Sequence, residues 1–199
     1  MGFHTFDAEQ AARLEDAAER YRYCSREELL GMLAPDPAAV VADLGSGTGF
    51  YADDVAPHVG TLHAVDVQPA MHDYYRQKSA RDERAERGAT EPGLPANVDL
   101  VAADVGDLPF ADDALDGAYG TMTFHEFADD ASVAELARVC RPGARLALVD
   151  WSAAGAGETG PPLSERYEAD DAAAMLAGAG FDVDRADERV ETLAVTATR

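Results

Sequence analysis

The chain contains no isoleucine and a single lysine, Lys78, whereas 38 of its 199 residues are acidic. The formal net charge of −22 repels nucleic-acid phosphates and anionic lipid headgroups, so a role on DNA, RNA or a membrane surface is disfavoured. No apolar run approaches the roughly 20 residues that span a bilayer, and the first ten residues do not read as a secretory signal. These absences predict a soluble, cytoplasmic protein.

Cysteine is scarce as well. Cys24 and Cys140 lie far apart and lack the spacing of metal ligands, which fits a reducing cytosol. The five histidines are scattered, and the segment HEFAD at 125–129 is not the H-E-x-x-H of zinc proteases. No metal site is predicted.

Bulky apolar residues are sparse, at 16 Leu, 15 Val and 7 Phe, and with this charge they meet a compositional rule for disorder. Forty alanines and a strong apolar pattern overrule that rule. An excess of acids, Arg in place of Lys, and Ala or Val in place of larger aliphatics resemble the proteins of halophilic archaea. An ordinary acidic protein from a GC-rich genome is the alternative.

Residues 1–37 are predicted to form two helices separated by a turn, because apolar residues recur there at helical spacing. Asp7 with Gln10, and Ser25 with Glu28, have the spacing of helix-capping pairs. The composition then changes, and residues 38–199 are expected to form one domain without internal repeats.

Short apolar runs alternate with helical patterns along residues 38–199. This alternation predicts an α/β fold, with a parallel sheet covered by helices on both faces. The main helices are predicted at 68–88, 129–140 and 166–178. The strands are predicted at 39–45, 61–67, 98–105, 114–123 and 145–151, followed by two alternating segments within 181–199.

The segment VADLGSGTGF (41–50) carries the most specific signal. Three glycines alternate after a buried strand and before a helix, which allows a tight turn and lets a ligand lie against bare backbone. A dinucleotide fingerprint needs glycine where Phe50 stands, and no lysine follows as in a phosphate-binding loop. A plain strand–helix turn is the alternative.

The D-x-G-x-G-x-G pattern from Asp43 resembles the first motif of class I S-adenosylmethionine-dependent methyltransferases. DLPFADDALDGAY (107–119) and ELARVCRPGARLALVD (135–150) are similar to the small-molecule branch, which includes ubiquinone- and menaquinone-type enzymes. The resemblance covers about 38–199. It implies a Rossmann-like, seven-stranded, mostly parallel sheet whose last strand is antiparallel.

The resemblance also implies roles for single residues. In such enzymes the acid at the position of Asp66 holds the ribose hydroxyls, and Asp104 and Val105 contact the adenine. Asp43 either orders the loop or contacts the cofactor directly, and Asp66 could instead only cap the next helix. The implied S-adenosylmethionine-binding residues are Asp43, Gly45, Ser46, Gly47, Gly49, Asp66, Val67, Asp104, Val105 and Thr121.

Methyl transfer from a sulfonium is an in-line displacement, so positioning supplies much of the rate and a base is needed only for a protonated acceptor. His125, after the fourth strand, is the candidate catalytic base, and a structural loop histidine is the rival interpretation. In this family the segment before the first motif commonly folds over the substrate. Residues 1–37 are therefore expected to form a helical cap, with Phe6, Tyr21, Tyr23 and Cys24 lining the site or packing a helix face.

The expected function is methyl transfer from S-adenosylmethionine to a small-molecule acceptor, by a monomer or homodimer. One alternative is a nicotinamide-dependent oxidoreductase, which Phe50 disfavours. The other is a non-catalytic S-adenosylmethionine-binding protein, which stays open because no residue here is obligatory for the chemistry.

Overall fold

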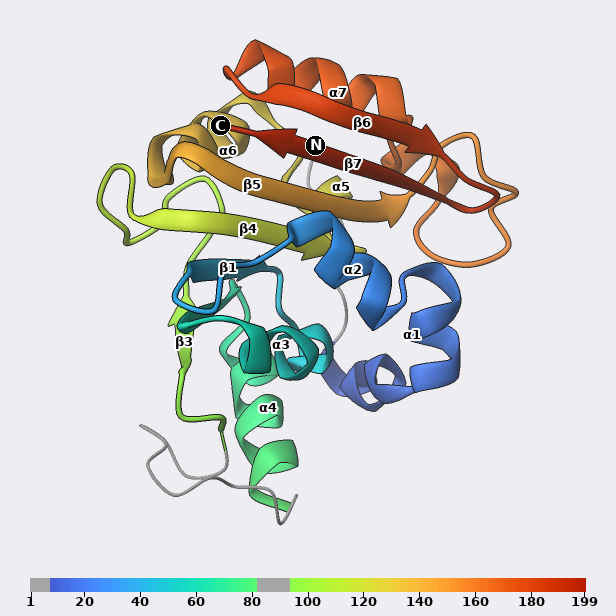
Figure 1. Ribbon diagram of the computed structural model, residues 1–199. Coiled ribbons are helices and arrows are strands. Elements are labelled where there is room, and N and C mark those ends of the chain that lie inside the picture. Colours follow the sequence, from blue (N-terminus) through green and yellow to red (C-terminus); the bar gives the residue numbers. More distant parts are fainter. Residues whose placement is uncertain (1–7, 82–93) are drawn as a thin grey trace.

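Buried apolar runs form the centre of a seven-stranded sheet in the computed structural model, which describes residues 8–81 and 94–199. The sheet has the order β3-β2-β1-β4-β5-β7-β6 (Figure 1). The strands are β1 (Val40–Leu44), β2 (Thr61–Asp66), β3 (Val98–Ala102), β4 (Leu115–Thr121), β5 (Cys140–Trp151), β6 (Asp182–Glu188) and β7 (Thr192–Thr198). Only β7 runs antiparallel to its neighbours, so the predicted fold is confirmed.

Helices cover both faces of the sheet. The α-helices are α1 (Ala17–Tyr23), α2 (Arg26–Leu33), α3 (Phe50–Val55), α4 (Pro69–Arg81), α5 (Phe124–Phe127), α6 (Asp130–Val139) and α7 (Ala169–Gly178). Short 3₁₀ helices are η1 (Ala8–Glu15), η2 (Ala56–His58) and η3 (Leu163–Glu165). None of the described helices is long and apolar enough to cross a membrane.

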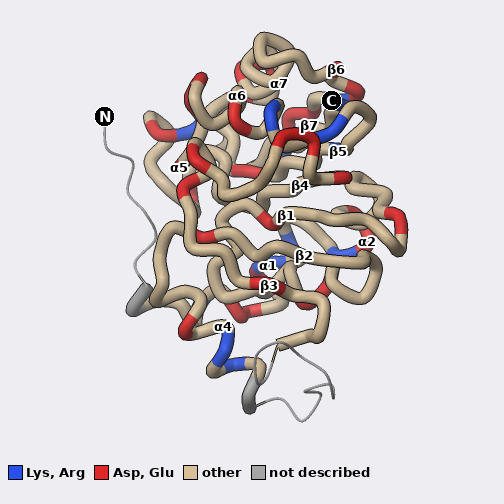
Figure 2. Tube along the Cα trace, turned by 90° about the vertical axis from the view of Figure 1, so that its left-hand side faces the viewer, with Lys and Arg blue, Asp and Glu red and all other residues tan. Residues whose placement is uncertain are grey.

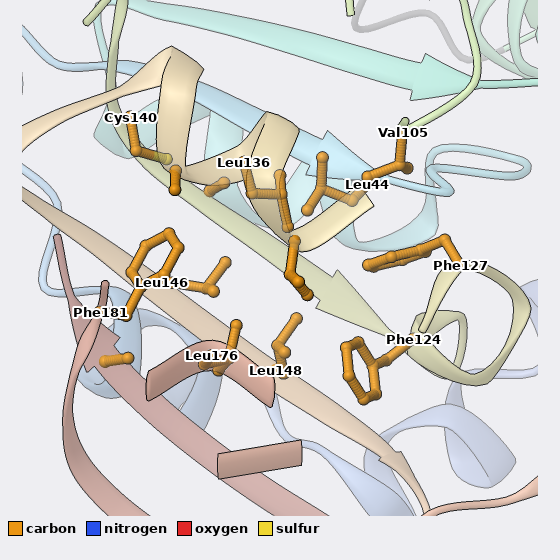
Figure 3. Packing of buried hydrophobic residues seen from close by; sticks show 14 of the residues in the cluster. Leu44, Val105, Phe124, Phe127, Leu136, Cys140, Leu146, Leu148, Leu176 and Phe181 are labelled. Carbon is orange, nitrogen blue, oxygen red and sulfur yellow. The ribbon is translucent and has the colours of Figure 1, made fainter. Parts of the chain in front are cut away.

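Two apolar clusters attach these helices to the sheet. One joins α5, α6 and α7 to it, and Figure 3 shows Leu136 of α6 and Leu176 of α7 beside Leu146 and Leu148 of β5. The other joins α2, α3 and α4 to the opposite face.

The order of the strands reverses at β1, which lies between β2 and β4. In sheets of this kind, ligands bind at the carboxyl ends of the strands at the point of reversal.

Several predicted boundaries were wrong. The first segment contains η1, α1 and α2 instead of two helices, because the Asp16 carboxylate accepts hydrogen bonds from the N–H groups of Ala18 and Glu19 and starts a new helix. The second capping pair is confirmed in part, since the Ser25 side chain accepts from the Glu28 N–H. Asp7, which was expected to cap the first helix, and Phe6, which was expected to line the site, lie outside the described residues.

The later boundaries differ too. The third strand ends at Ala102, before Asp104, and α7 begins at Ala169 because 163–165 form η3. The fifth strand begins at Cys140, since the backbone of 143–144 pairs with the last residue, Arg199. Helix α4 is described to Arg81, and its expected end at 88 lies outside the described residues.

Candidate active site

A cavity of about 1010 Å³ opens where the parallel strands end. Its wall comes from the glycine loop after β1 and from the segments that follow β2, β3 and β4. The N-terminal helices and residues 159–162 complete it. Nine predicted site residues line this cavity: Gly45, Ser46, Gly47, Asp66, Val67, Asp104, Val105, Thr121 and His125.

The glycine loop needs its glycines for two different reasons. At Gly45 an added Cβ would lie 2.7 Å from Cγ2 of Thr123, so the loop packs too closely for a side chain. At Gly47 the nearest atom, Cδ1 of Leu14, would be 3.5 Å away, but φ is +54°, where a side chain is strained. The loop therefore presents bare backbone to the cavity.

Asp66 braces this loop. It is the last residue of β2, and its two carboxylate oxygens accept hydrogen bonds from the N–H groups of Gly47 and Gln68, both at 2.8 Å. Burial raises the pKa of the carboxyl, and these two N–H groups oppose that rise. The next residue, Val67, is 55% exposed and lines the same wall.

Asp104 and Val105 lie in the loop beyond β3. Asp104 is exposed, and its Oδ1 accepts from the N–H of Gly106 at 2.8 Å, while Val105 is buried. Thr121 is the last residue of β4 and is buried in the cavity wall. A polar group and apolar surface thus lie side by side at this end of the cavity.

Asp43 and Gly49 lie outside the cavity wall. Asp43 is buried beneath the loop opposite Tyr119, and its Oδ1 has no hydrogen-bond partner in the described residues. Burial raises the pKa of Asp43 to about 7. A Cβ at Gly49 would overlap the ring of Tyr75. For Asp43, this buried position favours the alternative that the carboxyl orders the loop.

His125 forms a buried pair with Asp150. The Nδ1 of His125 lies 3.0 Å from each carboxylate oxygen, and the backbone N–H groups of His125 and Trp151 donate to the same carboxylate at 2.5 and 2.8 Å. A carboxylate only accepts, so the ring proton is assigned to Nδ1 and Nε2 is left as the acceptor. The pair can therefore take up a proton at Nε2.

Charges around the imidazole set its basicity. Burial lowers the pKa of His125, but the hydrogen bond and charge of Asp150 outweigh burial and raise it. Glu126, whose Oε1 is 4.0 Å from Nε2, and Glu165 raise the pKa further. Sequence reasoning missed Asp150, although it stands near the carboxyl end of β5, the strand beside β4.

The N-terminal helices supply part of the wall. Arg20 and Tyr23 of α1 line the cavity, whereas Tyr21 and Cys24 do not. The Tyr21 hydroxyl donates to Asp54 at 2.8 Å, and Cys24 is fully buried in the core. The guanidinium of Arg20 lies over neighbouring rings, and its Nε is buried without a hydrogen-bond partner in the described residues.

Tyr23 connects the N-terminal helices to the loop after β5. Its ring packs edge-on against Trp151 at 4.8 Å, and its hydroxyl shares a hydrogen bond with Oγ1 of Thr159 at 3.1 Å. Arg166 fixes that loop from behind, donating to the carbonyls of Thr159, Pro161 and Ser152. Tyr23, Trp151 and Thr159 therefore form one connected part of the cavity wall.

The sheet order, with β7 alone antiparallel, and the glycine loop after β1 define a class I S-adenosylmethionine-dependent methyltransferase domain. Residues 42–148, more than half of the chain, match the family model described as methyltransferase domain, and the chain belongs to that family. Among the described residues no group of three or more His, Cys, Asp or Glu could hold a metal ion.

Two curated relatives are similar to this chain over only part of their own length. An uncharacterized methyltransferase-like protein of Schizosaccharomyces pombe is 32% identical over 59% of this chain and 40% of its own. Demethylmenaquinone methyltransferase of Corynebacterium kroppenstedtii is 31% identical over 60% of this chain and 45% of its own. The chain thus spans less than half the length of these curated relatives. A SAM-dependent methyltransferase from Aquifex aeolicus is similar throughout: TM-score 0.82, 29% identity, 97% of this chain and 98% of that one.

Proposed function

We propose that the protein transfers a methyl group from S-adenosylmethionine to a small-molecule acceptor, and that His125 is the base where the acceptor carries a proton. The observation that carries this proposal is one cavity that joins a bare-backbone loop to a carboxylate-held imidazole. The comparisons give no support to a nicotinamide oxidoreductase.

The residues present fit the cofactor. Its amino-acid end has a carboxylate and an ammonium. On the loop side of the cavity lie three buried polar atoms that have no hydrogen-bond partner among residues 8–81 and 94–199: Nε of Arg20, Oγ of Ser46 and Oγ1 of Thr48. Arg20 is the natural partner for the carboxylate, because guanidinium groups pair well with carboxylates. The cavity is also of the size that holds a cofactor.

The nucleoside end has its own partners. A carboxylate offers about four acceptor sites, so Asp66 can hold two ribose hydroxyls while it keeps its two backbone hydrogen bonds. Val67 and Val105 supply apolar surface for the adenine, and Asp104 an acceptor for its amine. Gly45, Ser46 and Gly47 present loop backbone, and Thr121 closes the wall near the reacting centre.

The bound cofactor supplies an activated methyl group on a sulfonium. The chain then has to orient the acceptor, exclude water and take a proton. The Asp150 carboxylate holds His125 so that Nε2 accepts that proton.

The segment 1–37 is proposed to be a helical cap over the domain 38–199. Ion pairs support it: the single lysine, Lys78, bridges Glu15 of η1 and Asp53 of α3 at 3.2 and 2.9 Å. Arg189 also donates to the carbonyl of Tyr23 at 3.2 Å.

We further propose that the protein belongs to the small-molecule branch of the family. Two similarities support this: residues 107–119 resemble a segment of that branch, and one relative is a demethylmenaquinone methyltransferase. The composition supports an origin in a halophilic archaeon and a cytoplasmic location. We propose that the protein is a monomer or homodimer. We also propose that it binds neither nucleic acid nor membrane, because its net charge is −22; in Figure 2 the acidic residues are spread over the described chain and the basic ones are few.

The test is incubation with labelled S-adenosylmethionine and a panel of small phenols, amines and quinol-like compounds. Label should appear in at least one acceptor, and the His125→Ala variant should transfer it more slowly. Tight cofactor binding with no labelled product from any compound would favour the non-catalytic alternative.

A further inference from the structure

Helix α6 carries an ion pair that lies outside the cavity wall. Glu135 and Arg138 are three residues apart and therefore share one face of the helix. The Nε and Nη2 of Arg138 donate to the two carboxylate oxygens of Glu135 at 2.7 and 2.6 Å, which makes a bidentate pair. These hydrogen bonds lower the pKa of Glu135, so the carboxyl stays ionised and the pair is a fixed charged unit.

This pair holds the backbone of the segment that follows β3. Oε1 of Glu135 also accepts from the N–H of Leu108 at 2.8 Å, and Arg138 donates to the carbonyls of Leu108 and Phe110 at 3.2 and 2.8 Å. Arg138 further donates to the carboxylate of Asp112 at 2.8 Å. Both backbone polar groups of Leu108 are thus bonded to α6, and its side chain is buried in an apolar cluster to which α6 also contributes.

Leu108 directly follows a tight turn that contains Asp104 and Val105. The Asp107 N–H donates to the carbonyl of Asp104 at 3.0 Å, and the Gly106 N–H donates to the Oδ1 of Asp104 at 2.8 Å. Because these internal hydrogen bonds leave the turn little freedom, the position of Leu108 fixes the position of the Asp104 carboxylate.

The other end of the turn is attached to β2. The Ala103 N–H donates to the carbonyl of Asp66 at 3.3 Å, and Asp66 itself lies in the cavity wall. The turn 104–107 is therefore held at both ends, by the sheet at Ala103 and by α6 at Leu108. Removing the α6 pair would release one of these two ends.

From these contacts we propose that Glu135 and Arg138 are positioning residues for the base of the cofactor: they hold the turn so that the Asp104 carboxylate meets the adenine amine. The inference rests on the proposed function, because it names the residues through which the same site selects adenine. Asp104 is exposed, so water competes for its oxygens. A hydrogen bond from the amine is then favourable where the backbone already holds the carboxylate in place.

Calorimetry can compare S-adenosylhomocysteine with S-inosylhomocysteine, in which a carbonyl oxygen replaces the adenine amine. The wild-type chain should bind S-adenosylhomocysteine at least about tenfold more tightly, the low end of what a hydrogen bond to a charged group contributes. Arg138→Met keeps an apolar stem but loses every guanidinium hydrogen bond, so the ratio of the two affinities should fall to about threefold or less. An unchanged ratio in this variant overturns the inference alone. Equal binding of both ligands by the wild type overturns it together with the proposed role of Asp104.

Two further variants separate positioning from folding. Glu135→Gln is milder, because an amide has one oxygen for the three donors that the carboxylate accepts. If circular dichroism shows that Arg138→Met does not fold, the ratio should still fall in Glu135→Gln, and an unchanged ratio there overturns the inference. Arg26→Met is the matched control: it removes the same charge from an exposed side chain that pairs with Glu27 at 2.9 Å, and both affinities should stay as in the wild type.

Asp104→Ala tests whether the pair acts through Asp104. Removing this carboxylate should lower the ratio by itself, and adding Arg138→Met should lower it no further, because residues that act as one unit are not additive. A second fall of the same size in the double variant overturns the inference. A purely structural role of Arg138 would lower the melting temperature and leave the ratio unchanged.

Discussion

Replacing Asp150 by Asn tests how the chain controls its candidate base. The carboxylate accepts three N–H groups, from Nδ1 and the backbone of His125 and from the backbone of Trp151. An amide has one oxygen, so at least one of these hydrogen bonds is lost, and its NH₂ favours the tautomer with the proton on Nε2. The variant should therefore fold with a base in the wrong tautomer.

The stability cost follows from the lost hydrogen bond. A hydrogen bond to a charged group contributes about 1.5–3 kcal/mol. At roughly 2–4 °C per kcal/mol for a chain of this length, the melting temperature should fall by about 3–12 °C. The loss of turnover should be about 10²–10⁴-fold, the usual contribution of a general base.

The pH dependence has a defined sign. The pKa of His125 is raised in the folded protein, so its stabilisation is fully present below about 6.5, the unfolded value, and is lost as pH rises through the folded pKa. Turnover needs the neutral imidazole and should rise over that same interval. In Asp150→Asn only Glu126 and Glu165 remain to raise the pKa of His125 against the lowering effect of burial. The pKa of His125 and the rising part of the rate–pH curve should therefore both move to lower pH.

The assays are an NMR titration of the histidine ring protons, assigned with His125→Ala, and rates measured against pH. The double variant should be no slower than His125→Ala, because the two residues act as one unit. An unchanged His125 pKa in Asp150→Asn, or fully additive rate losses, would refute the assignment of Asp150 as the positioning residue.

Three further outcomes are expected. Gly47→Val should abolish S-adenosylhomocysteine binding in calorimetry, whereas Gly143→Val, which also has a positive φ (+86°) and has open space around it, should keep full affinity. Asp66→Ala should weaken the same binding by about 1.5–3 kcal/mol or more, because it also releases the loop, and unchanged affinity would remove Asp66 from the site. Circular dichroism should show loss of structure between molar salt and about 10 mM, since salt screens the repulsion at −22 net charge; a flat profile would favour an ordinary acidic protein.

The pattern of apolar runs was enough to predict a parallel sheet with helices on both faces, because each buried strand and each helix face is marked locally. The antiparallel last strand was implied by the family resemblance. The glycine loop and the strand-end position of Asp66 could be predicted for the same reason. Asp150 could not be paired with His125 from spacing, because 25 residues separate them and only the pairing of β4 with β5 brings them together.

Two further features could not be decided from the local sequence. Asp43 is the residue before the last of β1 and is buried opposite Tyr119, whereas Asp66 ends β2 and lies in the cavity wall. Pro142 and Gly143 look like a turn, yet pairing with the far end of the chain at Arg199 keeps that segment in β5. In both cases distant residues decide what the local pattern leaves open.

Thermal unfolding with S-adenosylhomocysteine, NAD or NADP tests the cofactor site most directly. At about 100 times its dissociation constant a ligand adds about 2.7 kcal/mol, which is roughly 5–11 °C for a chain of this length. S-adenosylhomocysteine should raise the melting temperature by that amount, and Asp66→Ala should reduce the rise, while NAD and NADP leave it unchanged. A rise with NAD or NADP and none with S-adenosylhomocysteine would contradict the account.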